Sequence, residues 1–397
     1  SNVLASLFRF FFLPLQSCTA KVFMVVNMKK FRIVPDIYLC DTAEKFCKAF
    51  CIGADDLVFI GRSSWKYFDG LVNGAHVIFR NDYGSGEPTD VLVEKIYEDT
   101  KDVPYKRVIA VGGGTIIDVA KLLALKTYTP VLDLYDRKIP LERTKELVIV
   151  PTTCGTGSEV TNISILELTA RHTKMGLADD ALFANSAVLV PELLNGLPYQ
   201  FFATSSIDAL VHATESFLSP KATPFSREFS IRAAELILGG YRRIKDEGAD
   251  AREKLYGDFL LASAYAGIAF GNAGTGAVHA MSYSFGAAYH VPHGEANYVL
   301  YSAVFRAYQK LNPSGDIALL RKVMSPFLDC YEDKAFDALS SFLEIILPLK
   351  PMSAYGTKEA DIAVFTENTM TKQQRLMANN YVTLSAAQVE EIYRSVL

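Results

Sequence analysis

Four of the six histidines lie in the second half of the chain, and one of them stands four residues after an aspartate. Asp208 and His212 fall in a run predicted to be helical, so their side chains project from one face. His279 closes a glycine-rich segment, and His293 follows Pro292, which prevents a helix from running through this point. One carboxylate and three imidazoles suit a borderline divalent ion such as Fe²⁺ or Zn²⁺, with a position left open for substrate.

Each part of this set also has a simpler interpretation. An aspartate and a histidine at helical spacing more often form a surface ion pair or a hydrogen-bonded couple than a metal site. The two further histidines favour metal binding, because they occur in turns bounded by glycine and proline. The elements that precede them in the chain add to this hypothesis.

Four short runs rich in valine and isoleucine come before the histidines, at residues 57–60, 76–79, 107–111 and 146–150. Continuous apolar runs of this length are typical of parallel strands that are covered on both faces. Between the second and third runs, residues 89–100 carry apolar side chains at helical spacing. This alternation predicts an open, doubly wound, Rossmann-like α/β sheet.

A glycine triplet follows the third run. Gly112, Gly113 and Gly114 lead through Thr115 into a predicted helix that contains Asp118. Without Cβ atoms the backbone N–H groups can approach an anion closely, and the start of the helix adds a partial positive charge. The triplet is not the G-x-G-x-x-G fingerprint and could be only a tight turn. Its place between a buried strand and a helix nevertheless predicts a pyrophosphate site.

A second loop of small residues follows the fourth run and contains Thr152, Thr153, Cys154 and Thr156. Ligands of open α/β sheets bind beyond the carboxyl ends of the strands, so both loops are expected to face the same ligand. The hydroxyl groups could bond a ribose or a phosphate, or only cap the turn. Cys154 has no histidine nearby in the sequence and is interpreted as a turn residue rather than a nucleophile.

At 397 residues the chain is long enough for two domains. The β-rich runs stop near residues 197–198, and amphipathic helical patterns follow at 226–245, 251–270 and 298–311. The last helix is expected to begin with a capping box at Ser385. We therefore predict an α/β dinucleotide-binding domain at 24–197 and an all-helical metal and catalytic domain at 198–397. Residues 1–23 are interpreted as a leader or extension ahead of a start at Met24 or Met28.

Composition limits the partners. The net charge is −4 and no run of lysine or arginine occurs, which argues against nucleic acid or an acidic membrane as a partner and favours a small molecule. Six cysteines without a C-x-x-C pair fit a reducing, cytoplasmic location better than a disulfide framework.

Four ordered segments, residues 112–121, 151–159, 208–215 and 279–294, resemble the iron-containing (group III) alcohol dehydrogenase family, from about Met28 to the C-terminus. The resemblance implies an N-terminal Rossmann-like domain and a C-terminal helical metal domain, the fold shared with dehydroquinate synthase. It also implies an NAD(P)-dependent oxidoreductase that acts on CH–OH groups, with NAD(H) or NADP(H) as cofactor. We further expect a homo-oligomer, a dimer or higher.

Roles carried over from this family apply to matching positions only. Asp208, His212, His279 and His293 correspond to the metal ligands. The expected cofactor contacts are Gly112, Gly113, Gly114, Thr115, Asp118, Thr152, Thr153 and Thr156. Tyr283 stands where many members have a second histidine, so Tyr283 and His290 are both candidates for the proton relay. The chain has Gly61 and Arg62 where many NAD-preferring members carry an acidic residue, which leaves NAD and NADP open.

Within the family, residues 148–165, 171–180 and 289–298 are most similar to members that interconvert 4-hydroxybutyrate and succinate semialdehyde. A substrate carboxylate in a cleft needs a cation. Lys174, with Arg171 and His172, is the first candidate, and Lys221 with Arg227 the second. The alternatives are a general alcohol dehydrogenase for short primary alcohols or diols, a cyclase of the dehydroquinate synthase type, and a non-catalytic nucleotide-binding protein.

Overall fold

The computed structural model describes residues 28–397. The predicted leader or extension at 1–23 lies outside the described residues. Residues 31–397 form a compact unit and are described by themselves. Within the described part of the chain, every helix is too short or too polar to cross a membrane. The predicted boundary near residue 197 coincides with the change from strands to long helices, and the two-domain division itself stays a prediction.

Six parallel strands form the main sheet in the order β1-β8-β5-β4-β2-β3. Their bounds are β1 Asp36–Leu39, β2 Asp56–Ile60, β3 His76–Phe79, β4 Arg107–Gly112, β5 Glu146–Pro151 and β8 Ser186–Leu189. Four of them match the runs read from the sequence. The sequence analysis did not single out β1 and β8. Every residue of β1 is exposed at the sheet edge, so this strand carries no burial pattern.

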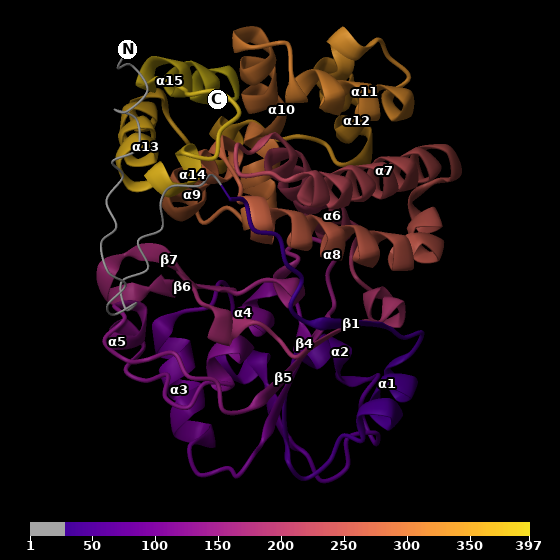
Figure 1. The fold of residues 1–397 in the computed structure, drawn as a ribbon, viewed down its shortest axis with the longest axis vertical. Coiled ribbons are helices and arrows are strands. Elements are labelled where there is room, and N and C mark those ends of the chain that lie inside the picture. Colours follow the sequence, from indigo (N-terminus) through magenta and orange to yellow (C-terminus); the bar gives the residue numbers. More distant parts are fainter. Residues whose placement is uncertain (1–27) are drawn as a thin grey trace, which may run out of the picture. The chain divides into compact units, whose positions relative to one another are not determined.

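Both faces of the sheet are covered. In β2, Leu57 and Phe59 pack into one cluster with residues of helices α3 (Asp90–Thr100), α4 (Gly114–Leu123) and α5 (Val131–Tyr135). Val58 and Ile60 point the other way, into a cluster with residues of α1 (Ala43–Phe50). The short helix α2 (Arg62–Trp65) follows β2. Burial on both faces explains why these strands read as continuous apolar runs. The doubly wound class is thereby confirmed (Figure 1).

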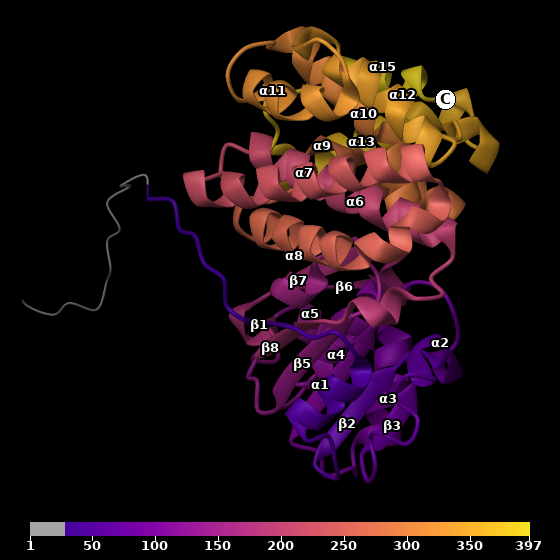
Figure 2. The same ribbon diagram turned by 90° about the vertical axis from the view of Figure 1, so that its right-hand side faces the viewer.

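A hairpin stands outside the main sheet. Strands β6 (Ile163–Leu168) and β7 (Thr173–Ala178) pair with each other in antiparallel fashion. The hairpin packs against α4 through β6 and against the helical half through β7. Figure 2 shows it between the sheet and the long helices. The sequence did not predict this element, which brings residues after the second glycine-containing loop toward the metal-binding helices.

Residues from Tyr199 onward are helical or irregular, as predicted. The helices are α6 Tyr199–Leu218, α7 Pro224–Glu247, α8 Tyr256–Ala273, α9 Ala277–Tyr289, α10 His293–Leu311, α11 Asp316–Leu328, α12 Ala335–Ile346, α13 Glu359–Lys372, α14 Gln374–Met377 and α15 Ala386–Ser395. The predicted capping box at Ser385 is present. The helix expected from residue 251 begins only at Tyr256, because Gly248, at φ 93°, ends α7 and a 3-10 segment follows.

Helix α6 lies in the middle of this half and packs against α7, α8 and α10. Most of its residues are buried, including the polar side chains of Asp208, His212 and Glu215. Buried charged and polar groups of this kind need partners. The face of α6 that carries them is therefore where a functional site is expected.

Candidate metal centre

The structure brings the four predicted ligands together. Asp208 and His212 lie one turn apart on α6, His279 lies in the first turn of α9, and His293 is the first residue of α10. Pro292 is the cap of α10, which explains how it sets the start of that helix at His293. One potential ligand atom from each of the four side chains lies within 4.8 Å of the others.

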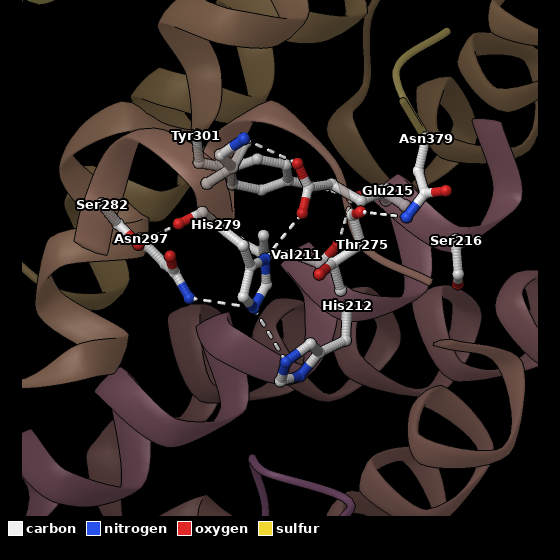
Figure 3. A network of polar contacts seen from close by, with 12 residues as sticks. Val211, His212, Glu215, Ser216, Thr275, His279, Ser282, Asn297, Tyr301 and Asn379 are labelled. Carbon is white, nitrogen blue, oxygen red and sulfur yellow. Dashed lines mark hydrogen bonds and ion pairs between the residues drawn. The ribbon is translucent and has the colours of Figure 1, made fainter. Parts of the chain in front are cut away.

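Hydrogen bonds at Nδ1 fix the orientation of two of the imidazoles. His212 Nδ1 lies 3.2 Å from the carbonyl oxygen of Gly155, and His279 Nδ1 lies 2.6 Å from Glu215 Oε2. A carbonyl and a carboxylate only accept hydrogen bonds, so both rings carry their proton on Nδ1 and present the lone pair of Nε2. Those two Nε2 atoms are 2.9 Å apart (Figure 3).

Two lone pairs at hydrogen-bond distance repel each other unless a cation or a proton lies between them. Burial lowers the pKa of His212 to about 3, so this ring is neutral at neutral pH and offers no proton. Asp208 Oδ1 lies 3.9 Å from His293 Nε2 and adds a negative charge to the same space. The donor set of three imidazoles and one carboxylate therefore fits a divalent cation.

Asn297 completes the surroundings of the ligands. Its Nδ2 donates to Asp208 Oδ1 at 2.7 Å and lies 3.1 Å from His293 Nε2 and 3.2 Å from His279 Nε2. The residue stands one helical turn after His293 on α10. An amide donor beside the carboxylate holds Asp208 in place. The sequence analysis did not assign this residue a role, although its spacing from His293 is the same as that between Asp208 and His212.

Glu215 was also missed as a functional residue. It follows His212 on the same face of α6 and is buried. Its Oε1 accepts from the backbone N–H of Val278 at 2.7 Å, while Oε2 accepts from His279 Nδ1. A carboxylate behind a histidine fixes the ring and makes its free nitrogen a better ligand. The spacing of Asp208, His212 and Glu215 on one helical face could have indicated this role.

The candidates for the proton relay lie at different places. The ring of Tyr283 on α9 is half-buried and its centroid lies 6.0 Å from that of His293. Burial raises the pKa of Tyr283 to about 12, so the phenol keeps its proton at neutral pH. His290 caps the far end of α9 and is exposed. Within the described part of the chain it makes no hydrogen bond to the four ligand residues, so the structure does not bring it into the cluster.

The predicted cofactor loops lie side by side at the carboxyl edge of the sheet. A Cβ atom on Gly113 would lie 3.2 Å from Thr153 Cγ2, and one on Gly114 would lie 3.0 Å from Thr156 Cγ2. Thr152 N donates to the carbonyl of Gly112 at 3.1 Å. The N–H groups at the start of α4, including that of Thr115, have no acceptor within the helix. These positions form the kind of cradle that an anion occupies.

Asp118 has protein partners for both of its oxygens. Oδ1 accepts from Ser158 Oγ at 2.6 Å, and Oδ2 accepts from the N–H of Ile165 at 3.1 Å. Lys121 is fully buried beside it, with Nζ 2.7 Å from Ser158 Oγ. The observed contacts of Asp118 tie α4 to the second loop and to β6. A direct contact with the cofactor remains a prediction.

Two titratable side chains of the second loop, Cys154 and Glu159, are buried. Burial raises the pKa of Cys154 to about 12, and its Sγ lies 3.6 Å from Ser205 Oγ. A buried thiol with a raised pKa is a poor nucleophile, which agrees with the interpretation of Cys154 as a turn residue. Burial also raises the pKa of the Glu159 carboxyl to about 7.

The candidate cations differ in their partners. Lys174, on β7, pairs with Glu87 at 3.1 Å and is 24% exposed. Its charge lies within electrostatic range of His293. Arg171 pairs with Asp136, and Arg227 pairs with Asp316, so each of these arginines already has a carboxylate partner. His172 and Lys221 are exposed.

A doubly wound sheet with a candidate anion cradle at its carboxyl edge, beside a helical cluster of one aspartate and three histidines, is the arrangement expected of a metal-dependent dehydrogenase. Residues 38–191 match the model of iron-containing alcohol dehydrogenase, and residues 202–397 match the C-terminal model of the Fe-containing alcohol dehydrogenase family. The chain belongs to the iron-containing alcohol dehydrogenase family. It is accordingly an oxidoreductase of the class that acts on CH–OH groups, and the family resemblance read from the sequence is confirmed.

Curated relatives and solved structures agree with this assignment. A 4-hydroxybutyrate dehydrogenase of Clostridium kluyveri is 49% identical over 370 residues, which cover 93% of this chain and 100% of that protein. Long-chain-alcohol dehydrogenase 1 of Geobacillus thermodenitrificans is 31% identical and covers 78% of this chain, with 79% of its own length matched. A solved 1,3-propanediol oxidoreductase shares the fold at a TM-score of 0.81 and 23% identity, covering 93% of this chain and 100% of its own.

Proposed function

We propose that this enzyme interconverts 4-hydroxybutyrate and succinate semialdehyde with a nicotinamide cofactor and a divalent ion, Fe²⁺ before Zn²⁺. In the oxidative direction the C4 carbon of the alcohol gives a hydride to NAD(P)⁺, and the hydroxyl proton passes to solvent. The observation that carries the proposal is the 49% identity to a 4-hydroxybutyrate dehydrogenase across 93% of the chain. The convergent Nε2 atoms of His212 and His279 support the metal.

Asp208, His212, His279 and His293 would hold the ion, which supplies a Lewis acid for the substrate oxygen when bound. The chain's own part is to keep these four side chains in position. Glu215 holds the His279 ring through Nδ1, and the Gly155 carbonyl does the same for His212.

The cofactor would lie on the two loops at the carboxyl edge of the sheet. The N–H groups after Gly113, at the start of α4, suit a pyrophosphate. The hydroxyls of Thr152, Thr153 and Thr156 are assigned to the nicotinamide end on the family resemblance. Because Gly155 in the same loop accepts from His212, this loop also joins the cofactor site to the metal site. The choice between NAD and NADP remains open in this proposal.

Proton transfer is proposed to use Tyr283 before His290. Tyr283 is protonated at neutral pH and its ring lies beside His293, whereas His290 is exposed at the end of α9. A neutral phenol can pass a proton while its own pKa stays high, provided that water or substrate takes the proton on. Cytoplasmic residence and assembly as a homo-oligomer are further parts of the proposal, the first based on the use of cysteine.

The test is a substrate panel on iron-reconstituted protein with NADH and NADPH, with the product identified as 4-hydroxybutyrate. We expect reduction of succinate semialdehyde with at least one of the two cofactors. His212→Ala should lose both bound metal and turnover, because it removes a ligand and leaves Asp208 partly uncompensated. Metal content and turnover near the parent's in this variant would contradict the assignment of the site.

A further inference from the structure

One arginine of the described chain stands apart from the others. Arg375, in the short helix α14, is exposed and makes neither a hydrogen bond nor an ion pair with any described residue. Every other arginine between residues 28 and 397 has an acidic or carbonyl partner, as Arg171 does with Asp136 and Arg321 does with the carbonyl of Pro313. A guanidinium offers five N–H donors in a fork that matches a carboxylate. Arg375 is therefore available to an external anion.

Helix α14 is fixed beside the metal centre. It packs against α9, the helix that carries His279 and Tyr283. One turn after Arg375, Asn379 donates from Nδ2 to the carbonyl of Thr275 at 2.9 Å, just before α9 begins. Figure 3 shows Asn379 and Thr275 next to Glu215, behind the ligand His279. The chain just after Arg375 is thus tied to the segment that leads into α9.

Arg375 and Tyr283 lie on helices that pack against each other, α14 and α9. Burial raises the pKa of the Tyr283 phenol, and among the surrounding charges that of Arg375 opposes this increase. The ring of Tyr283 is in turn next to His293. His293 is the most exposed of the four predicted ligands, with 33% of its side chain accessible, so substrate is expected to enter on this side.

Lys174 is the rival cation, and its situation is different. Its ammonium pairs with Glu87 at 3.1 Å, so binding a substrate carboxylate there would bring two carboxylates to one lysine or require the ion pair to open. Arg375 has no such competitor among the described residues. Its fork also holds a carboxylate in one orientation, which a lysine does not do.

We propose that Arg375 binds the carboxylate of the substrate and thereby selects ω-hydroxy acids and their semialdehydes over simple alcohols and aldehydes. The inference rests on the proposed function and names the residue that gives it its specificity. Three carbon–carbon bonds separate the reacting carbon of succinate semialdehyde from its carboxylate carbon. The substrate would therefore extend from the metal ligands past Tyr283 toward α14.

The experiment compares Arg375→Gln, Arg375→Lys, Lys174→Gln and Lys372→Gln with the parent. Lys372 is the matched control, an exposed cation three residues away at the end of α13. Arg375→Gln should lower kcat/KM for succinate semialdehyde by about tenfold or more, mainly through KM, because a charge-assisted contact of this kind is lost. Reduction of butanal and the affinity for NADH, measured by fluorescence titration, should stay at the parent's values. The kcat/KM of Arg375→Lys for succinate semialdehyde should lie between that of the parent and that of Arg375→Gln.

The outcomes separate the inference from the proposed function. If the parent prefers succinate semialdehyde and Arg375→Gln keeps that preference, or if Lys174→Gln is the variant that loses it, the role of Arg375 is refuted while the proposed function stands. Weaker NADH binding without a change in substrate preference would identify a phosphate contact and also refute the role. An equal loss for both aldehydes would show a structural effect instead. A parent without any preference would overturn both.

Discussion

At the scale of single residues, the metal centre depends on side chains that do not touch the ion. Asp208, His212, His279 and His293 could be selected from the sequence because helical spacing and turn residues are local signals. Glu215 and Asn297 were missed, although their helical spacing from His212 and His293 is visible in the sequence, because their partners come together only when α6 packs against α9 and α10. Gly155 acts through its backbone carbonyl, for which no side-chain pattern exists.

Replacing Glu215 by Gln should weaken metal binding. The carboxylate accepts from His279 Nδ1 at 2.6 Å, and an amide is a weaker, uncharged acceptor that leaves the ring less basic. We expect metal affinity to fall by about 10- to 100-fold, because removing the hydrogen-bond partner of a metal-ligating histidine typically has an effect of this size. Equilibrium dialysis against Zn²⁺ would measure this. Glu228→Gln, an exposed change on α7, serves as the control, and equal affinities for the two variants would refute the role of Glu215.

Glu159 should make stability depend on pH. Burial raises the pKa of its carboxyl from 4.5 to about 7, and one of its oxygens has no partner among the described residues. The folded chain then binds this proton more tightly than the unfolded chain, so stability falls as the pH rises from about 4.5 to about 7. Glu159→Gln should therefore stabilise the protein at pH 8 by on the order of 1–3 kcal/mol and have little effect at pH 4.5. Unfolding midpoints that differ from the parent's equally at both pH values would contradict this.

At the scale of elements, the prediction succeeded where burial imposes a pattern. Strands β2, β4 and β5 are covered on both faces and were found within a residue of their ends. The edge strand β1 was missed because its residues are exposed and its partner β8 is distant in the sequence. The hairpin of β6 and β7 was missed because only some of its residues are buried, so it carries no continuous apolar run. The predicted start of α8 was early because the charged segment before it continues the apolar spacing without forming an α-helix.

The packing of the second loop on the helices gives an element-scale test. A Cβ atom on Gly267 of α8 would lie 2.6 Å from the carbonyl oxygen of Gly157, closer than real Cβ atoms approach. Gly267→Ala should therefore destabilise the protein by about 1–3 kcal/mol through displacement of the loop. Gly271 lies one turn later on the same helix, and a Cβ there would meet only Thr161 Cγ2 at 3.5 Å. Gly271→Ala should be neutral or slightly stabilising. If the urea midpoint falls equally in both variants, the destabilisation comes from a general effect on helix α8 and the loop contact is not its cause.

At the scale of the whole molecule, the fold supplies two halves of one site. The sheet provides the proposed anion cradle and the helices provide the proposed metal ligands, and the loop at residues 152–159 lies against α6 and α8. The sequence predicted both halves, because each carries its own local signals. For the substrate carboxylate it named Lys174 first and did not consider Arg375, which lies far along the chain and belongs to no recognisable motif.

The central claim is that the enzyme acts on a four-carbon hydroxy acid rather than on alcohols in general. The most direct test is the ratio of kcat/KM for succinate semialdehyde to that for butanal, measured on the iron-reconstituted parent with its preferred cofactor. The two aldehydes have the same number of carbon atoms and differ in the carboxylate. A charge-assisted contact of about 1.5–3 kcal/mol predicts a ratio of roughly ten or more. A ratio near one would contradict the account and leave a general iron-type alcohol dehydrogenase.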